Sequence, residues 1–164
     1  MRKKMMSLVI LILLLFSVFS PVSAQTYYFS VPRSEINVFI NSDGTIDIEY
    51  IIDFYNDTSA DPIDYVDIGL PNSNYSISGI TAKIDGKNVN HIANSQYVSP
   101  GIELGLGADS IQPGDTGRVH VWINSIPDVF FNSKEPENYA SINFSPNWFG
   151  SQYVFGKTEM IFTY

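Results

Sequence analysis

The sequence predicts an all-β domain, an antiparallel two-sheet β-sandwich of immunoglobulin-like type. Apolar and polar residues alternate over many short segments, and turn-forming residues separate these segments at intervals of about 8–12 residues, as in sandwiches. The composition is rich in Tyr, Phe, Ile, Val and Thr, which favour strands. No long stretch shows the 3.6-residue period of an amphipathic helix. A jelly roll or an open barrel is the alternative.

The first expected unit is a hairpin of strands 35–40 and 45–55, joined by a turn at 41–44 that contains Gly44. Apolar residues occupy every second position on both sides of this turn, which indicates strands with one buried face. Residues 36, 38 and 40 share one face of the first strand, and residues 46, 48, 50, 52 and 54 share one face of the second.

Later strands are expected where alternation resumes between turn signals. Asp85-Gly86 is typical of a type I′ hairpin turn, and Gln112-Pro113-Gly114-Asp115 of a type II turn. Segment 102–106 is spaced by glycines and predicts a bulge or an edge strand, whereas polar segment 128–138 predicts a loop. The expected strands are 63–70, 80–84, 88–92, 102–106, 117–124, 139–144 and 153–164.

The N-terminus has the three parts of a secretory signal peptide. Arg2, Lys3 and Lys4 precede an apolar run at 7–19, and Pro21-Val22-Ser23-Ala24 ends in a small-x-small site. The run is shorter than the ~20 apolar residues of a membrane-spanning helix, which makes a retained anchor the less favoured alternative. We therefore expect residues 1–24 to be removed and the rest to be extracytoplasmic, either secreted or at the cell surface.

The remaining chain is expected to hold a linker at 25–33 and one β-sandwich domain at 34–164. Residues 158–164 read as a strand still in progress, which favours a domain truncated at its C-terminal end. Any membrane contact would then depend on a segment beyond this sequence.

Charge and cysteine content exclude several classes of function. The chain has no cysteine, which removes thiol chemistry, disulfides and thiolate metal sites. Three of the nine basic residues lie in the expected signal peptide, which leaves six basic against 17 acidic residues, a net charge of −11. Because a chain this acidic repels phosphate backbones, we expect no nucleic-acid partner.

The acidic segment 53–67 offers candidate metal ligands. Asp57, Asp61 and Asp64 stand where loops at one end of a sandwich could gather carboxylate oxygens, which suit Ca²⁺. The alternative is a solvated acidic surface that keeps strand edges from pairing.

The aromatic segment 144–155 is the candidate ligand-binding region. Trp148 and Tyr153 combine large apolar area with polar handles, which suits stacking on sugar rings or capture of a peptide, and Trp122 could join the same patch. The alternative is that these rings complete the core.

The chain shows no catalytic motif: HExxH, GxSxG and P-loop patterns are absent, and only two histidines occur. We therefore expect no enzymatic activity. Sequons at Asn56, Asn74 and Asn143 fit surface loops of a secreted chain, although chance explains them equally well.

The hairpin around Asp43-Gly44, with its alternating Ile36, Val38 and Ile40 and the signal peptide before it, resembles the start of the prokaryotic membrane proteins called DUF2207. The turn at 112–115 is also similar. The resemblance implies an extracytoplasmic β-rich domain followed by transmembrane helices, and it implies no activity or functional residue.

These observations predict a non-catalytic extracytoplasmic domain of a cell-envelope protein that works by binding or spacing. Its partner would be a protein or a polysaccharide of the envelope. The alternative is a secreted carbohydrate-binding module that uses Trp122, Trp148 and Tyr153.

Overall fold

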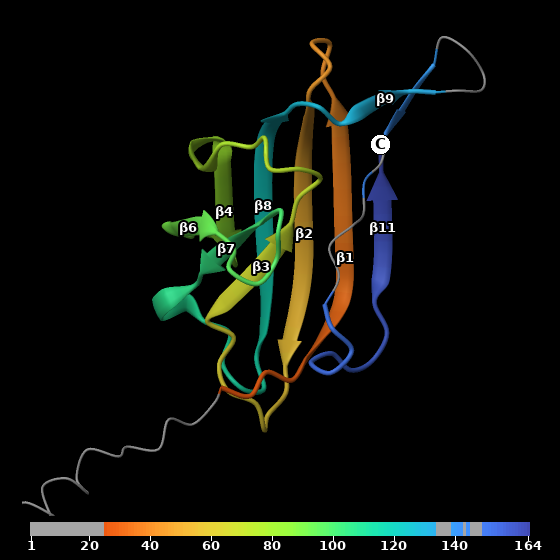
Figure 1. Ribbon diagram of the computed structural model, residues 1–164. Helices are drawn as coiled ribbons and strands as arrows, with labels where there is room; N and C mark the ends of the chain where they lie inside the picture. The colour runs from red at the N-terminus through yellow and green to blue at the C-terminus, as the bar shows by residue number, and fades with distance from the viewer. Residues whose placement is uncertain (1–24, 134–138, 143, 145–148) are drawn as a thin grey trace, which may run out of the picture.

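The computed structural model describes residues 25–133, 139–142, 144 and 149–164. These residues form three sheets and two short 3₁₀ turns, with no α-helix among them (Figure 1). The larger sheet has the order β11-β1-β2-β8-β4-β5, the second β3-β7-β6 and the third β10-β9. The strands are β1 Phe29–Ile40, β2 Ile46–Asn56, β3 Tyr65–Gly69, β4 Ile80–Ile84, β5 Lys87–Asn88, β6 His91–Asn94, β7 Gly101–Gly105, β8 Thr116–Ile126, β9 Phe130–Asn132, β10 Ala140–Ile142 and β11 Glu159–Thr163.

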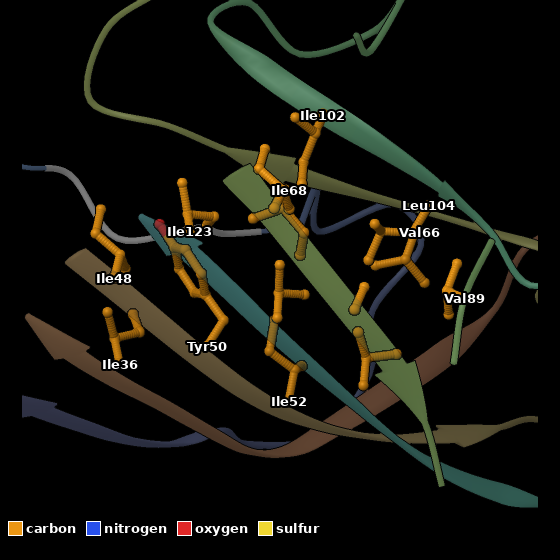
Figure 2. Packing of buried hydrophobic residues seen from close by; sticks show 14 of the residues in the cluster. Ile36, Ile48, Tyr50, Ile52, Val66, Ile68, Val89, Ile102, Leu104 and Ile123 are labelled. Atoms are coloured by element: carbon orange, nitrogen blue, oxygen red, sulfur yellow. The ribbon is translucent and has the colours of Figure 1, made fainter. Parts of the chain in front are cut away.

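The core lies between the six-stranded and the three-stranded sheet. Figure 2 shows Ile48, Tyr50 and Ile52 of β2 facing Val66 and Ile68 of β3. Strand β2 alternates strictly between buried and half-buried residues, because one face packs on the core and the other faces outward. These two packed layers confirm the predicted all-β sandwich, and neither sheet closes into a barrel.

The turn signals give the predicted hairpins. The amide of Gly44 donates to the carbonyl of Asn41 in the β1–β2 turn, and Gly44 has a φ of +83°. Asp85 and Gly86 both have positive φ, as a type I′ turn requires. Gly114 has a φ of +85° at the third position of its turn, which fits the predicted type II geometry.

The expected linker 25–33 is shorter than predicted, because β1 begins at Phe29. Phe29 and Val31 are buried, and the pairing of β1 with β2 shifts register between Ser30 and Arg33. This irregularity interrupts the two-residue period around Pro32, which hides the first part of the strand in the sequence.

Three other predicted elements differ in detail. Expected strand 88–92 is divided, since β5 pairs with β4 in the larger sheet and β6 pairs with β7 in the smaller one. Strand β7, expected as a bulge or an edge, is the central strand of its sheet. Expected loop 128–138 contains β9, which pairs with β10.

The last strand joins the sheet in an unexpected direction. Strand β11 runs parallel to β1, with Glu35 opposite Ile161 and Ile36 opposite Phe162, whereas the other strand pairs of the sheets are antiparallel. Sequence alternation identifies a strand but not its neighbour.

In the described part of the chain, no helix is long and apolar enough to cross a membrane. The predicted signal peptide 1–24 lies outside the described residues.

Candidate functional site

Trp122 lies on the outer face of β8, away from the core. Its ring stacks on Phe39 of β1, with centroids 5.2 Å apart and an interplanar angle of 37°. Its indole N–H donates to the Oδ1 of Asn124. The half-buried Trp122 and the more exposed Phe39 form an aromatic pair on a face that also carries charged residues such as Glu49 and His120.

Tyr153 lies at the opposite end of the same sheet. Its carbonyl accepts from the amide of Phe29 (2.9 Å), which is opposite Asn56 in the register, whereas Trp122 is opposite Glu49. Seven residues of β2 separate these two levels, a distance of about 23 Å at the rise of a strand. Trp122 and Tyr153 therefore lie far apart along the sheet, although the sequence allowed Trp122 to join the patch of Tyr153. Trp148 lies outside the described residues.

Part of the predicted ligand-binding segment packs on the core. The ring of Phe149 meets Phe29 and Phe54 edge to face, at centroid distances of 5.5 and 5.4 Å. Phe155 packs on Tyr28 at 4.8 Å. These contacts match the alternative weighed from the sequence, in which the rings complete the core, while Tyr153 remains 46% exposed.

The predicted calcium ligands instead hold nearby chain segments. The Asp61 carboxylate accepts from the amide of Thr26 (2.7 Å), and the Asp64 carboxylate accepts from the hydroxyl of Tyr27 (2.6 Å). Burial and this carboxylate raise the pKa of Tyr27. Asp57 accepts from the amide and hydroxyl of Ser59 within its own turn.

Across the described residues, no group of three or more His, Asp or Glu side chains is arranged to hold a metal ion. The calcium site stays a prediction, and its three carboxylates have an observed role in fixing residues 26–27 and the turn after β2.

The outer face of the six-stranded sheet carries cross-strand charge pairs. The Arg118 guanidinium binds both carboxylate oxygens of Asp53, at 2.6 and 2.8 Å, and this bond holds the pKa of Asp53 below its ordinary value. Within β1, a hydrogen bond from Arg33 likewise lowers the pKa of Glu35, two residues along the same strand. His120 contacts Glu49 at 2.7 Å. Opposite charges on neighbouring strands make this face polar and largely self-satisfied.

The outer face of the smaller sheet brings two carboxylates together. Asp67 of β3 is directly opposite Glu103 of β7, and Ser95 donates its hydroxyl to Asp67. Burial raises the pKa of Asp67, and the charge of Glu103 adds to this effect. His91 lies 3.3 Å from Glu103. Sequence reasoning missed this cluster, because nothing in the alternation of β3 shows which residue of β7 is opposite Asp67.

Two open hollows flank the Asp85-Gly86 turn, with volumes of about 240 and 600 Å³. The smaller is bordered by the ion pair of Lys87 with Asp109, and the larger by Asp53 and Arg118, which bind each other. The ion pairs beside both hollows are thus closed within the chain.

Exposed apolar side chains gather around the last strands. We call the following set the β9–β11 surface: Phe131, Tyr139, Ile142, Met160, Phe162 and Tyr164, each at least 40% exposed. The ring of Phe144, two residues after β10, contacts Phe162 at 5.8 Å, which connects the β9–β10 hairpin to β11. Met160 and Phe162 share the core side of the sheet with Ser34 and Ile36. They stay exposed because the three-stranded sheet lies over β2, β8 and β4 and does not extend to β11 (Figure 1).

The sequons have different environments. Asn56 is fully buried, and its amide group donates to the carbonyls of Asp61 and Ile111. It is therefore inaccessible in the folded chain. Asn74 is exposed and donates to the carboxylate of Asp128. Asn143 lies outside the described residues.

Comparison with known proteins gives only distant structural likenesses. No family model matches the chain, and no curated protein matches it. An M1 zinc metallopeptidase from Deinococcus radiodurans matches at a TM-score of 0.45 with 15% identity, over 65% of this chain and 22% of that chain. A variant of a two-domain M1 zinc metallopeptidase bound to L-arginine matches at 0.45 with 15% identity, over 70% of this chain and 24% of that chain.

The chain thus spans less than a quarter of the solved proteins it matches. A likeness at TM-scores below 0.5 supports no conclusion about zinc binding or peptidase activity in this chain.

Proposed function

We propose that the chain is a non-catalytic, extracytoplasmic domain of a cell-envelope protein that binds a protein partner through the β9–β11 surface. The observation that carries this proposal is that six apolar side chains on β9, β10, β11 and the residues beside them are each at least 40% exposed. Exposed apolar patches mark contact sites in soluble proteins, and the contact of Phe144 with Phe162 joins the β9–β10 hairpin to β11.

The contrast between the faces supports the same surface. On the outer face of the six-stranded sheet, Arg118 with Asp53 and His120 with Glu49 satisfy one another across strands. The β9–β11 surface has aromatic and Met side chains, the types enriched at protein interfaces, with Glu159 as the single charged residue on β11. The predicted signal peptide supports an extracytoplasmic location.

The proposal is tested by retention of the exported chain on isolated cell envelopes of the organism that carries it. Phe131→Ser removes an apolar residue of the β9–β11 surface, and Phe39→Ser is the matched control on the outer face, since both side chains are about half exposed. We expect a loss of retention of about tenfold for Phe131→Ser, the effect of one interface residue, and none for Phe39→Ser. An envelope that does not retain the unaltered chain would contradict the proposal.

A second candidate is carbohydrate binding, and the Phe39–Trp122 pair favours it. This pair lies on a flat polar face with Asn124 beside it, a combination that suits sugar stacking. Trp122→Ala would then abolish retention on envelope polysaccharide with little change in melting temperature. Retention that survives Trp122→Ala but is lost in Phe131→Ser excludes this candidate in favour of the first.

A further inference from the structure

We propose that the free edge of β11 pairs antiparallel with β11 of a second copy of this chain. The contact gives a two-fold symmetric dimer in which the two six-stranded sheets join into one continuous sheet. This inference rests on the proposed function, because it names the protein that occupies part of the β9–β11 surface.

The first observation is that β11 is an edge strand. It pairs with β1 on one side, and within the described residues no strand pairs with its other side. Alternate residues of β11 therefore offer backbone N–H and C=O groups along this edge. Edges that avoid pairing usually have Pro, Lys or a bulge, and β11 is the regular segment Glu159-Met160-Ile161-Phe162-Thr163.

The second observation is that β11 complements itself in one register. When two copies pair antiparallel about Ile161, all five residues find partners: Ile161 meets Ile161, Met160 meets Phe162, and Glu159 meets Thr163. No like charges are opposed. Met160 and Phe162 lie on the core side of the sheet, so the pairing covers two half-exposed apolar side chains of each copy.

The opposite edge of the sheet does not offer the same match. It ends in β5, a strand of two residues, and exposes Lys83 and Lys87 around a tight turn. A short, lysine-bearing edge is protected against strand addition. A head-to-tail chain of copies through this edge is therefore disfavoured, and closed two-fold pairing of β11 with itself remains.

The β9–β10 hairpin fits the same arrangement. In Figure 1 it extends past β11 on the side of the free edge, and the contact of Phe144 with Phe162 places its base against β11.

The test uses the natural absence of cysteine, which makes any introduced thiol unique. In the proposed register, residues 161 of the two copies face each other, whereas residues 159 are four positions apart, about 13 Å. We expect Ile161→Cys to form a disulfide-linked dimer under mild oxidation and Glu159→Cys, the control, not to form one, because disulfides require Cα atoms within about 7 Å. A mixture of Glu159→Cys and Thr163→Cys chains is expected to cross-link, since these residues are opposite one another.

Sedimentation equilibrium of the unaltered exported chain completes the test. A dimer that forms between about 10 and 500 µM supports the proposal, and a monomer throughout this range overturns it. Equal cross-linking of Ile161→Cys and Glu159→Cys overturns the register and with it the proposal. If the chain stays monomeric while envelopes still retain it through Phe131, the second-copy inference fails and the proposed function stands.

Discussion

Asn56 shows how one residue can hold several loops together. It ends β2, its side-chain amide donates to the carbonyls of Asp61 and Ile111 at 2.9 and 3.0 Å, and its main chain bonds Gly114 and Asp115. Its Oδ1 is buried without a partner among the described residues. A sequence motif marks this residue as a glycosylation acceptor. In the folded chain its buried side-chain amide instead hydrogen-bonds the backbone of two other segments.

We expect Asn56→Ala to lower the free energy of unfolding by about 2–3 kcal/mol, because it removes two hydrogen bonds of a fully buried amide and leaves a cavity in its place. Urea denaturation of the chain measures this change. Thr58→Ala is the control, since it removes the sequon from an exposed position and leaves the Asn56 amide in place. Equal destabilisation by both substitutions would show that the sequon, and not the amide, is responsible.

The raised pKa of Asp67 predicts that the stability of the fold depends on pH. Burial raises its pKa, so the folded chain binds this proton more tightly than the unfolded chain does. The contribution of Asp67 to stability therefore falls as pH rises from the ordinary pKa of aspartate to the raised one. Asp67→Asn removes this loss and can still accept the hydroxyl of Ser95.

We therefore expect the Asp67→Asn chain to match the unaltered chain near pH 3 and to exceed it by about 0.5 kcal/mol near pH 7, the usual size of one cross-strand charge contact. Thermal unfolding across this pH range measures the difference. A gap that is the same at every pH would mean that the charge of Asp67 is not its cause.

At the scale of an element, β7 shows why a central strand can begin with a glycine. A Cβ on Gly101 would lie 2.8 Å from the carbonyl oxygens of both Ile68 and Val98. These are backbone atoms, which cannot move aside as a flexible side chain can. Gly101 therefore allows β7 to approach β3 closely. This explains why a glycine stands here, although glycine in general weakens strands.

We expect Gly101→Ala to destabilise the chain by about 2 kcal/mol through this overlap. Gly79→Ala is the matched control, since a Cβ there meets only one carbonyl oxygen at 3.9 Å. Chemical denaturation compares the two variants. Similar values for both would mean that β7 can shift to accept the methyl group.

At the scale of the whole molecule, acidity governs behaviour in salt. The described carboxylates Asp57, Asp61 and Asp64 have hydrogen-bond donors of their own, and the chain has an excess of negative charge. Cations can raise stability by screening this repulsion without occupying any site.

We therefore expect equal melting temperatures in NaCl and CaCl₂ at matched ionic strength, with EDTA causing no change. Differential scanning fluorimetry of the chain gives this comparison. A higher melting temperature in CaCl₂ alone, lost in Asp61→Asn, would instead support the calcium site expected from the sequence.

Local information in the sequence determined the β class, the β1–β2 hairpin and three turns. Alternation indicates which residues face the core. Asp85-Gly86, Gly44 and Gly114 indicate turns with positive φ. Both signals are local, because each depends only on residues that are neighbours in the chain. The first residues of β1 were missed because a register shift between Ser30 and Arg33 breaks the alternation.

Long-range pairing was decided only by the tertiary structure. The parallel neighbour of β11, the facing of Asp67 and Glu103, and the separation of Trp122 from Tyr153 depend on which strands pair across tens of residues. The burial of Asn56 depends on loops that begin far along the chain. Alternation is a property of a single strand, so the composition and the two-residue period of the sequence determine where strands form. Sites and free edges depend on the order in which strands pair, which these local properties do not determine.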